Sequence, residues 1–287
     1  MSPSPSSLVQ LLHPWMRGLL WVAGGLVFIA GIQLFILTDE TDRYFAWTIQ
    51  PPLTAAFLGA AYWSSCVLEL TAAREHAWAR ARAAVPAALL FTTLTLIATL
   101  IHFDRFHIGA DHAPETRVLT WVWIGVYTVV PPVMLLLLIR QSRTPGDDLP
   151  AERAISFWLR ALISAQAVLT VAVGAMLFSL PEAMADVWPW QLTPLTARVL
   201  GAWLLGLSVA AAQVMLENEW GRARPVFISC IAFGVLQFIA LARYPDSVRW
   251  DGAAIWVYLI WLVSLGLIGI YGAWNASRSM AMAHQHV

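Results

Sequence analysis

Eight long apolar segments constrain this chain more than any other feature of its sequence. Crossing the hydrocarbon core of a bilayer, about 30 Å thick, takes roughly 20 apolar residues in a helix. The segments that meet this requirement are 16–37, 53–73, 84–101, 118–139, 157–180, 195–216, 225–242 and 253–274. Charged residues make up only 12% of the chain, whereas a soluble domain carries about 25%. The sequence therefore predicts an all-α integral membrane protein with eight transmembrane helices.

The distribution of arginine predicts how these helices are oriented. All 17 basic residues are Arg, and 11 of them lie beside one set of segment ends while 6 lie beside the other. Basic residues accumulate on the cytoplasmic side of membrane proteins, so both termini are predicted to be cytoplasmic. The first apolar run is longer than that of a signal peptide, and no small-x-small cleavage site follows it. We therefore expect a retained first helix in a multi-pass protein of a bacterial plasma membrane.

The chain contains an internal repeat. The tetrapeptide PLTA at 52–55 recurs at 194–197, a separation of 142 residues (194 − 52). The same separation aligns Trp78, Arg80 and Arg82 with Trp220, Arg222 and Arg224. Matches that stay in register across a helix and into the next loop indicate a duplicated unit.

The duplication divides the chain into two units of four helices. We expect a cytoplasmic tail at 1–14, a first repeat at 15–140, a polar linker at 141–154, a second repeat at 155–275 and a cytoplasmic tail at 276–287. Because four is an even number, both units enter the membrane from the same side. The predicted fold is therefore two parallel four-helix repeats related by an axis along the membrane normal.

Each repeat leads into its second helix with a similar aromatic phrase, FAWTIQPPLT at 45–54 and WPWQLTPLT at 188–196. Both copies lie on the predicted outer side. One interpretation is an interfacial anchor, with Trp rings at headgroup depth and Pro at the helix start. The other is a pair of ligand-binding lips around an outward-facing cavity, where an arginine could also bind an anionic headgroup. The residues expected in such a site are Trp47, Thr54, Trp190, Thr196 and Arg198.

The outer loop at 101–117 concentrates imidazole and carboxylate side chains, which together suit zinc or a related divalent ion. The candidate metal ligands are His102, Asp104, His107 and Asp111. The His residues are five positions apart, which on a helix turns them about 140° from each other and differs from the i, i+4 pair of a zinc-binding helix. The alternative is a solvated loop. Its ion pairs, and those of the matching loop in the second repeat, would be Asp104–Arg105 and Arg243–Asp246.

The polar residues inside the spans argue against several chemistries. No His lies in the middle of a predicted span, so a buried b-type haem with two axial His is not expected. The charged residues Glu69, Arg198 and Glu217 lie close enough to span ends to snorkel towards an interface, so no proton relay built on a mid-depth carboxylate is expected. Cys66 and Cys230 lie inside spans and provide neither a disulfide framework nor a CxxC site.

Three classes of function stay open. The duplication and the neutral polar side chains of the spans favour a transporter, channel or binding protein for a neutral or lipid-like small molecule, with an outward-facing cavity between the repeats. The alternatives are a structural or partner-binding subunit, which the short loops fit, and an outer-leaflet enzyme. Such an enzyme would use His102, Asp104, His107 and Asp111, with or without a metal. No catalytic motif assigns an enzyme. Membrane lipid is the expected partner, a protein partner or second copy stays open, and no nucleic acid is expected.

Overall fold

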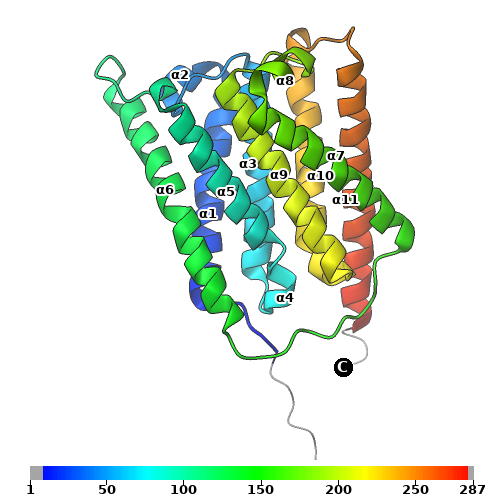
Figure 1. Cartoon of the computed structure of the whole chain (residues 1–287). Coiled ribbons are helices and arrows are strands. Elements are labelled where there is room, and N and C mark those ends of the chain that lie inside the picture. Colours follow the sequence, from blue (N-terminus) through cyan, green and yellow to red (C-terminus); the bar gives the residue numbers. More distant parts are fainter. Residues whose placement is uncertain (1–8, 284–287) are drawn as a thin grey trace, which may run out of the picture.

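The computed structural model describes residues 9–283 of the chain. Within them the protein is a bundle of helices (Figure 1), eight of which are long and apolar enough to cross a membrane. The spans are α1 (Pro14–Gly31) with its π-helical continuation η1 (Ile32–Ile36), α3 (Pro52–Arg74), α5 (Ala84–Ile101), α6 (Pro114–Ser142), α7 (Phe157–Ser179), α9 (Pro194–Glu217), α10 (Trp220–Arg243) and α11 (Ala253–Ala283). The protein is therefore a polytopic, multi-pass membrane protein.

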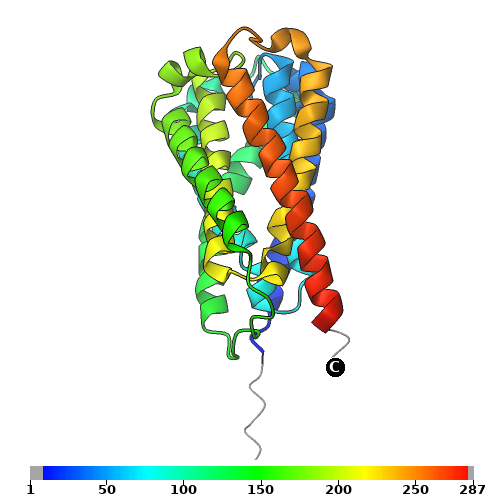
Figure 2. The same ribbon diagram turned by 90° about the vertical axis from the view of Figure 1, so that its right-hand side faces the viewer.

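Short helical turns lie at the two ends of the bundle (Figure 1). We call one end of the bundle the α4 end, after α4 (Trp78–Ala81). α4 lies there near the connection between α6 and α7, and α1 begins and α11 ends at the same end. Figure 2 shows the same arrangement from the side. We call the opposite end the α8 end. Its short elements are η2 (Thr38–Glu40), α2 (Thr41–Tyr44), η3 (Phe103–Arg105), α8 (Pro181–Val187) and η4 (Pro245–Ser247).

Each predicted apolar segment matches one of the eight spans along most of its length, and local capping moves some of the ends. α10 begins at Trp220, five residues before its predicted start at 225. The reason is the side chain of Glu219, whose carboxylate accepts hydrogen bonds from the backbone N–H groups of Gly221 at 3.0 Å and Arg222 at 2.8 Å. These bonds satisfy donors that the first turn of a helix leaves free.

Helices extend into both segments that the sequence predicts as tails. Pro14, the last residue of the tail predicted at 1–14, is the first residue of α1, and residues 1–8 lie outside the described residues. The tail predicted at 276–287 is helical as far as Ala283. No Gly or Pro interrupts the chain between the apolar part of α11 and this residue, so nothing local ends the helix earlier.

The spans of each half of the chain pack against each other and also against spans of the other half. α3 packs against α1 and against α10, whereas α9 packs against α7 and against α5. α5 also contacts α6, and α10 contacts α11. α3 is the most central span, with 72% of its most apolar stretch buried, compared with 22% for α6 and for α7. The outer helices therefore present most of their apolar surface to the membrane.

Two glycines allow the closest approaches between a span and the backbone of a neighbouring span. A Cβ on Gly59 of α3 would lie 2.5 Å from the backbone nitrogen of Phe35 in η1. A Cβ on Gly201 of α9 would lie 2.6 Å from the carbonyl oxygen of Gly174 in α7. Contacts this close need a residue without a side chain. The two glycines are 142 residues apart (201 − 59), the separation of the sequence repeat.

Candidate functional site

A cavity of about 390 Å³ lies at the α8 end, between the two copies of the aromatic phrase. Its walls are Trp47, Thr48, His102, Arg105, Thr193, Pro194 and Leu195. The first copy of the phrase supplies two of these residues, the second copy supplies three, and the end of α5 with η3 supplies the two basic groups. Apolar walls with a few convergent polar groups are typical of small-molecule sites.

A capping box at the start of α9 fixes the second copy of the phrase. The Thr193 hydroxyl accepts a hydrogen bond from the Thr196 backbone N–H at 3.3 Å, and the Thr196 hydroxyl accepts one from the Thr193 backbone N–H at 3.2 Å. This reciprocal arrangement satisfies free donors at the helix start. Thr196 is fully buried, so it shapes the cavity by holding Thr193 in the wall.

Thr54 joins the two copies. Its side chain is fully buried, and its hydroxyl donates a hydrogen bond to the carbonyl oxygen of Gln191 at 3.1 Å. α3 begins after Pro51 with no side-chain cap of its own. The first copy is therefore held in part by its contact with the second.

Trp47 packs into the bundle at the α8 end. Its side chain is 2% exposed, and its ring centre lies 4.7 Å from that of Phe45, 5.0 Å from that of Trp123 and 5.4 Å from that of Phe106. Aromatic pairs at these distances stabilise beyond the area that they bury. Trp47 thus backs the cavity as part of a rigid aromatic cluster.

Trp190 occupies the corresponding place in the second half. It is fully buried, with ring centres of Trp188, Tyr258 and Phe57 at 5.2, 5.4 and 5.8 Å. Trp47 and Trp190 are therefore packed inside the protein, whereas a ring that serves as an interfacial anchor contacts lipid headgroups. The physical reason is that both segments fold back over the bundle, where other aromatic side chains cover them.

Arg198 reaches the cavity through His102. Its Nη1 donates to His102 Nε2 at 2.6 Å, and since an arginine only donates, His102 is neutral with its proton on Nδ1. In agreement, burial lowers the pKa of His102, and the charge of Arg198 lowers it further. Arg105 pairs with Asp104 at 3.2 Å, and both side chains are 72% exposed. An exposed pair is weak, so the Arg105 guanidinium is free to turn towards a ligand.

The four side chains considered as metal ligands do not converge. Within residues 9–283, no group of three or more His, Cys, Asp or Glu side chains is placed to hold a metal ion. His107 is buried: its Nδ1–H donates to the Phe45 carbonyl at 3.1 Å, and its Nε2 accepts from the Thr48 hydroxyl at 3.0 Å. Burial lowers the pKa of His107. His107 therefore orients Thr48 in the cavity wall, whereas Asp104 and Asp111 lie at the surface.

One of the two expected loop ion pairs forms. Asp104 and Arg105 are paired, as described above. Arg243 has different partners: it donates hydrogen bonds to the carbonyl oxygen of Phe35 and to the hydroxyl of Tyr244, the latter at 3.1 Å. Its guanidinium therefore ties the end of α10 to η1.

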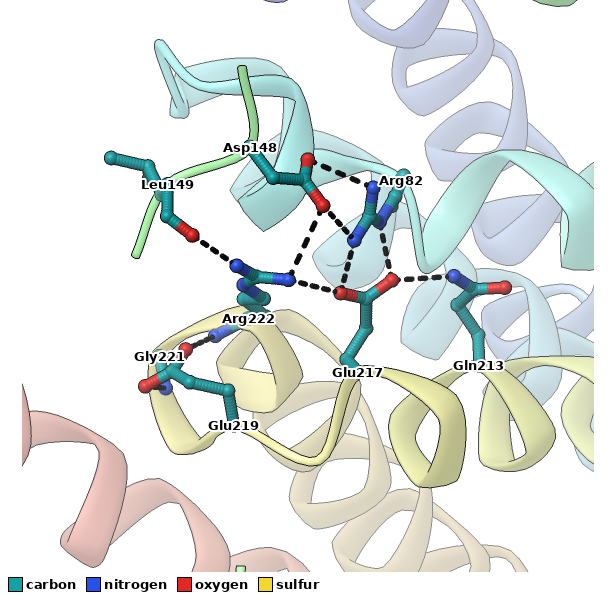
Figure 3. Close-up of polar contacts among 8 residues, drawn as sticks. All are labelled: Arg82, Asp148, Leu149, Gln213, Glu217, Glu219, Gly221 and Arg222. Carbon is teal, nitrogen blue, oxygen red and sulfur yellow. Dashed lines mark hydrogen bonds and ion pairs between the residues drawn. The ribbon is translucent and has the colours of Figure 1, made fainter. Parts of the chain in front are cut away.

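A largely buried ionic network lies at the α4 end (Figure 3). Glu217, with a side chain 3% exposed, accepts hydrogen bonds from the guanidinium of Arg82 and from Arg222 Nη1, the latter at 2.8 Å. Gln213 donates to the same carboxylate at 2.7 Å. Asp148, in the connection between α6 and α7, accepts both terminal nitrogens of Arg82 at 3.0 and 2.8 Å. The network thus joins the first half of the chain, the second half and the connection between them.

Glu217 does not snorkel towards an interface as its position near a span end predicts. Arg82, 135 residues earlier in the chain, reaches it inside the bundle. Burial by itself acts to lower the pKa of Arg82, but the hydrogen bonds and charges of Glu217 and Asp148 outweigh it, and the net effect raises this pKa. Charge-assisted bonds of this kind are about twice as strong as neutral ones.

A second glutamate occupies the matching position of the first repeat. Glu75 lies 142 residues before Glu217 (217 − 75), inside a shared pattern E-x-x-W-x-R-A-R. Burial raises the pKa of Glu75, and the charges of Arg80 and Arg224 act in the opposite direction. Arg80 pairs instead with Glu152 at 3.6 Å, and no ion pair of Glu75 forms within 4 Å in the described part of the chain. The sequence pattern could have identified both glutamates.

Comparisons of the chain with protein-family models, with curated proteins and with solved structures gave no match. The cavity at the α8 end and the network at the α4 end are therefore the basis on which a function can be assigned.

Proposed function

We propose that the protein binds a lipid-like small molecule at the α8 end and carries it across the membrane between two four-helix repeats. One observation carries this proposal: the α8 end has a cavity between the two copies of the phrase, whereas at the α4 end a buried ionic network joins the two halves of the chain. In alternating access, a substrate site opens to one side of the membrane while the path to the other side is shut. The cavity at the α8 end and the network at the α4 end fit a state in which the site is open towards the α8 end.

The helix contacts support the parallel repeat. Each contact has a counterpart: α3 with α1 matches α9 with α7, α3 with α10 matches α9 with α5, and α5 with α6 matches α10 with α11. Gly59 and Gly201 occupy equivalent places in the first of these pairs. We infer that one repeat comprises α1, α3, α5 and α6, that the other comprises α7, α9, α10 and α11, and that movement occurs between them.

The excess of arginine beside the α4 end supports an orientation with this end and both termini in the cytoplasm. The cavity then faces outward. A single cysteine at Asp186, in α8, should react with an impermeant maleimide added to intact cells, and one at Ser142 should react only after lysis. The natural Cys66 and Cys230 are buried and give a low background. The reverse labelling pattern would refute the orientation.

The cavity walls define the chemistry of the molecule. Trp47, Pro194 and Leu195 form an apolar surface, while Arg105 and His102 offer a fixed positive charge and a neutral N–H donor. A ligand that satisfies both parts has an apolar chain and a head that accepts hydrogen bonds. A long-chain carboxylate has both features.

Binding of a fluorescent long-chain carboxylate to the protein in lipid nanodiscs tests this site. Arg105→Gln removes the charge and should weaken binding about tenfold, because a charge-assisted hydrogen bond contributes about 1.5 kcal/mol. Arg117→Gln is the matched control: it removes an exposed arginine at the same end, outside the cavity wall. An amine of the same chain length should bind weakly to both variants and to the wild type.

Equal affinity of the two arginine variants for the carboxylate would contradict the proposed site. Flux of the same probe into protein-containing vesicles then separates transport from binding. Binding without flux in any direction would favour a binding protein. A protein partner that co-purifies in fixed ratio, with no probe binding, would instead support the structural or partner-binding subunit.

A further inference from the structure

A second cavity, of about 80 Å³, lies inside the bundle. It is enclosed by α1, α3, α5 and α6 from the first half of the chain and by α9 and α10 from the second. Most of its walls are apolar, and the polar side chains among them are Ser64, Ser65, Glu69, Thr92, Tyr127 and Ser229. A cavity of this size has room for a few water molecules, which its polar side chains can hydrogen-bond.

Glu69 is the carboxylate of this central cavity. It lies on α3 five residues before Arg74, which corresponds to about 7.5 Å along the helix. Its position predicts snorkelling, but its side chain is buried, with 6% of the residue exposed, because α3 is the central span. Its Oε2 atom is buried without a hydrogen-bond partner among the described residues.

No positive side chain lines the central cavity to balance a charge on Glu69. The titratable groups around it are Tyr127 from α6, whose hydroxyl bonds that of Tyr62 at 2.5 Å, and Tyr62 and Cys66 from α3. The wall residues from α1, α5, α9 and α10 are not titratable. An unpaired carboxylate is costly in such surroundings, and the group avoids this cost when it holds a proton.

The hydroxyl groups of the cavity favour a protonated partner. Ser64, Thr92 and Ser229 each donate their hydroxyl proton to a backbone carbonyl oxygen at 2.8 Å. Their oxygens can therefore only accept further hydrogen bonds. A protonated carboxyl is a donor, and water in the cavity can relay its hydrogen bond to these oxygens.

We propose that Glu69 is a proton-binding site within the membrane, which takes up and releases one proton through the central cavity. A single carboxylate suits a proton better than a bare metal ion, because hard cations take about six oxygen ligands. Residues from both halves of the chain line the cavity. A change in the protonation of Glu69 therefore affects the contact between the two halves. This assigns the protein a proton-linked step, which goes beyond binding a small molecule at the α8 end.

Dicyclohexylcarbodiimide, an apolar reagent for protonated carboxyl groups, tests the proposal on the full chain in lipid vesicles. The carboxyl proton moves to a carbodiimide nitrogen while the carboxylate oxygen bonds to the central carbon. The O-acylisourea then rearranges to a stable N-acylurea, and no group is lost. Peptide mass spectrometry should find the adduct on Glu69. Above the point at which Glu69 titrates, labelling should fall about tenfold per pH unit, in step with the protonated fraction.

Two controls lie in the same chain. Glu182, exposed in α8, should react with a water-soluble carbodiimide and little with the apolar one, and Glu69 should show the opposite preference. Glu69→Gln should lose the adduct while keeping the tryptophan fluorescence of the wild type. Glu69→Asp should label more slowly, which keeps the test valid if the Gln variant folds poorly.

Several outcomes would overturn the proposal. They are the absence of an adduct on folded wild-type protein, labelling that does not change with pH, and equal labelling by the water-soluble reagent. Protection of Glu69 by added Na⁺ at constant pH would replace the proton by an alkali cation. None of these readouts depends on the carboxylate probe at the α8 end, so the central cavity and the outer cavity can fail separately.

Discussion

Replacing Glu217 by Gln tests whether the ionic network holds the two halves of the protein together. Gln keeps the shape of the side chain and one acceptor oxygen but removes the charge. It leaves two guanidinium groups facing each other, that of Arg82 with a side chain 21% exposed and that of Arg222 with a side chain 9% exposed. Asp148 is then the one carboxylate of the network that balances them.

The burial of these groups sets the expected loss. Removing one partner of a buried ion pair costs about 3–5 kcal/mol. Water reaches the network through Arg82 and through Asp148, whose side chain is 43% exposed, and Asp148 still neutralises one arginine. We therefore expect the free energy of unfolding to fall by about 2–3 kcal/mol, just below that range. The midpoint of thermal unfolding should fall by about 4–12 °C.

Tryptophan fluorescence of the protein in lipid nanodiscs, followed during heating, measures this midpoint, because Trp220 is buried at the start of α10 close to the network. The matched control is Glu75→Gln, at the equivalent position of the first repeat. Glu75 is half-buried and forms no ion pair within 4 Å among the described residues, so its loss should cost about 0–1 kcal/mol. Equal shifts for the two variants would refute the reasoning.

Three further measurements test other parts of the structure. Gly201→Ala should lower the free energy of unfolding by about 1–3 kcal/mol by forcing α9 away from α7, whereas Gly125→Ala, which meets open space, should be neutral or stabilising by up to about 1 kcal/mol. Gln237→Leu should lower the free energy of unfolding by about 1–3 kcal/mol, because a buried hydroxyl loses its acceptor: the Tyr258 hydroxyl donates to Gln237 at 2.9 Å. Chemical unfolding measures the free energies of the glycine variants and of this variant. Burial lowers the pKa of His107, so its unfolded state takes up a proton first as the pH falls below about 6.5. The amide protection factors of the loop around it, which are corrected for the pH dependence of intrinsic exchange, should therefore be lower at pH 5.5 than at pH 7.5, and a His107→Gln variant should show less of this change.

The spans could be predicted from the sequence because hydropathy is a property of short stretches of chain. The start of α10 could not be placed by hydropathy, because it depends on the Glu219 side chain bonding the backbone of its own helix. An acidic residue before an apolar run is nevertheless a readable signal for a helix start.

The place of the candidate site was predictable, but its contacts were not. The repeated phrase marks the α8 end, and the cavity at this end lies between its copies. Of the predicted ligand-binding residues, Trp47 lines this cavity. The other four are not among its wall residues: Thr54, Trp190, Thr196 and Arg198. The residues next to a tryptophan in the sequence are similar whether its ring is interfacial or buried in the protein. Only the folding of one segment over another distinguishes them, and hydropathy carries no information about that.

The duplicated pattern that contains Glu75 and Glu217 predicts two equal networks, and the structure has one. The difference comes from the connection between α6 and α7, which occurs once in the chain and places Asp148 beside Arg82 and Arg222. A connection that is present once cannot meet two equivalent repeats in the same way. The connection therefore decides which of the two matching glutamates is paired. In the movement between the two halves that we propose, Glu217 would leave Arg82, and Asp148 would remain as a counter-charge on this arginine.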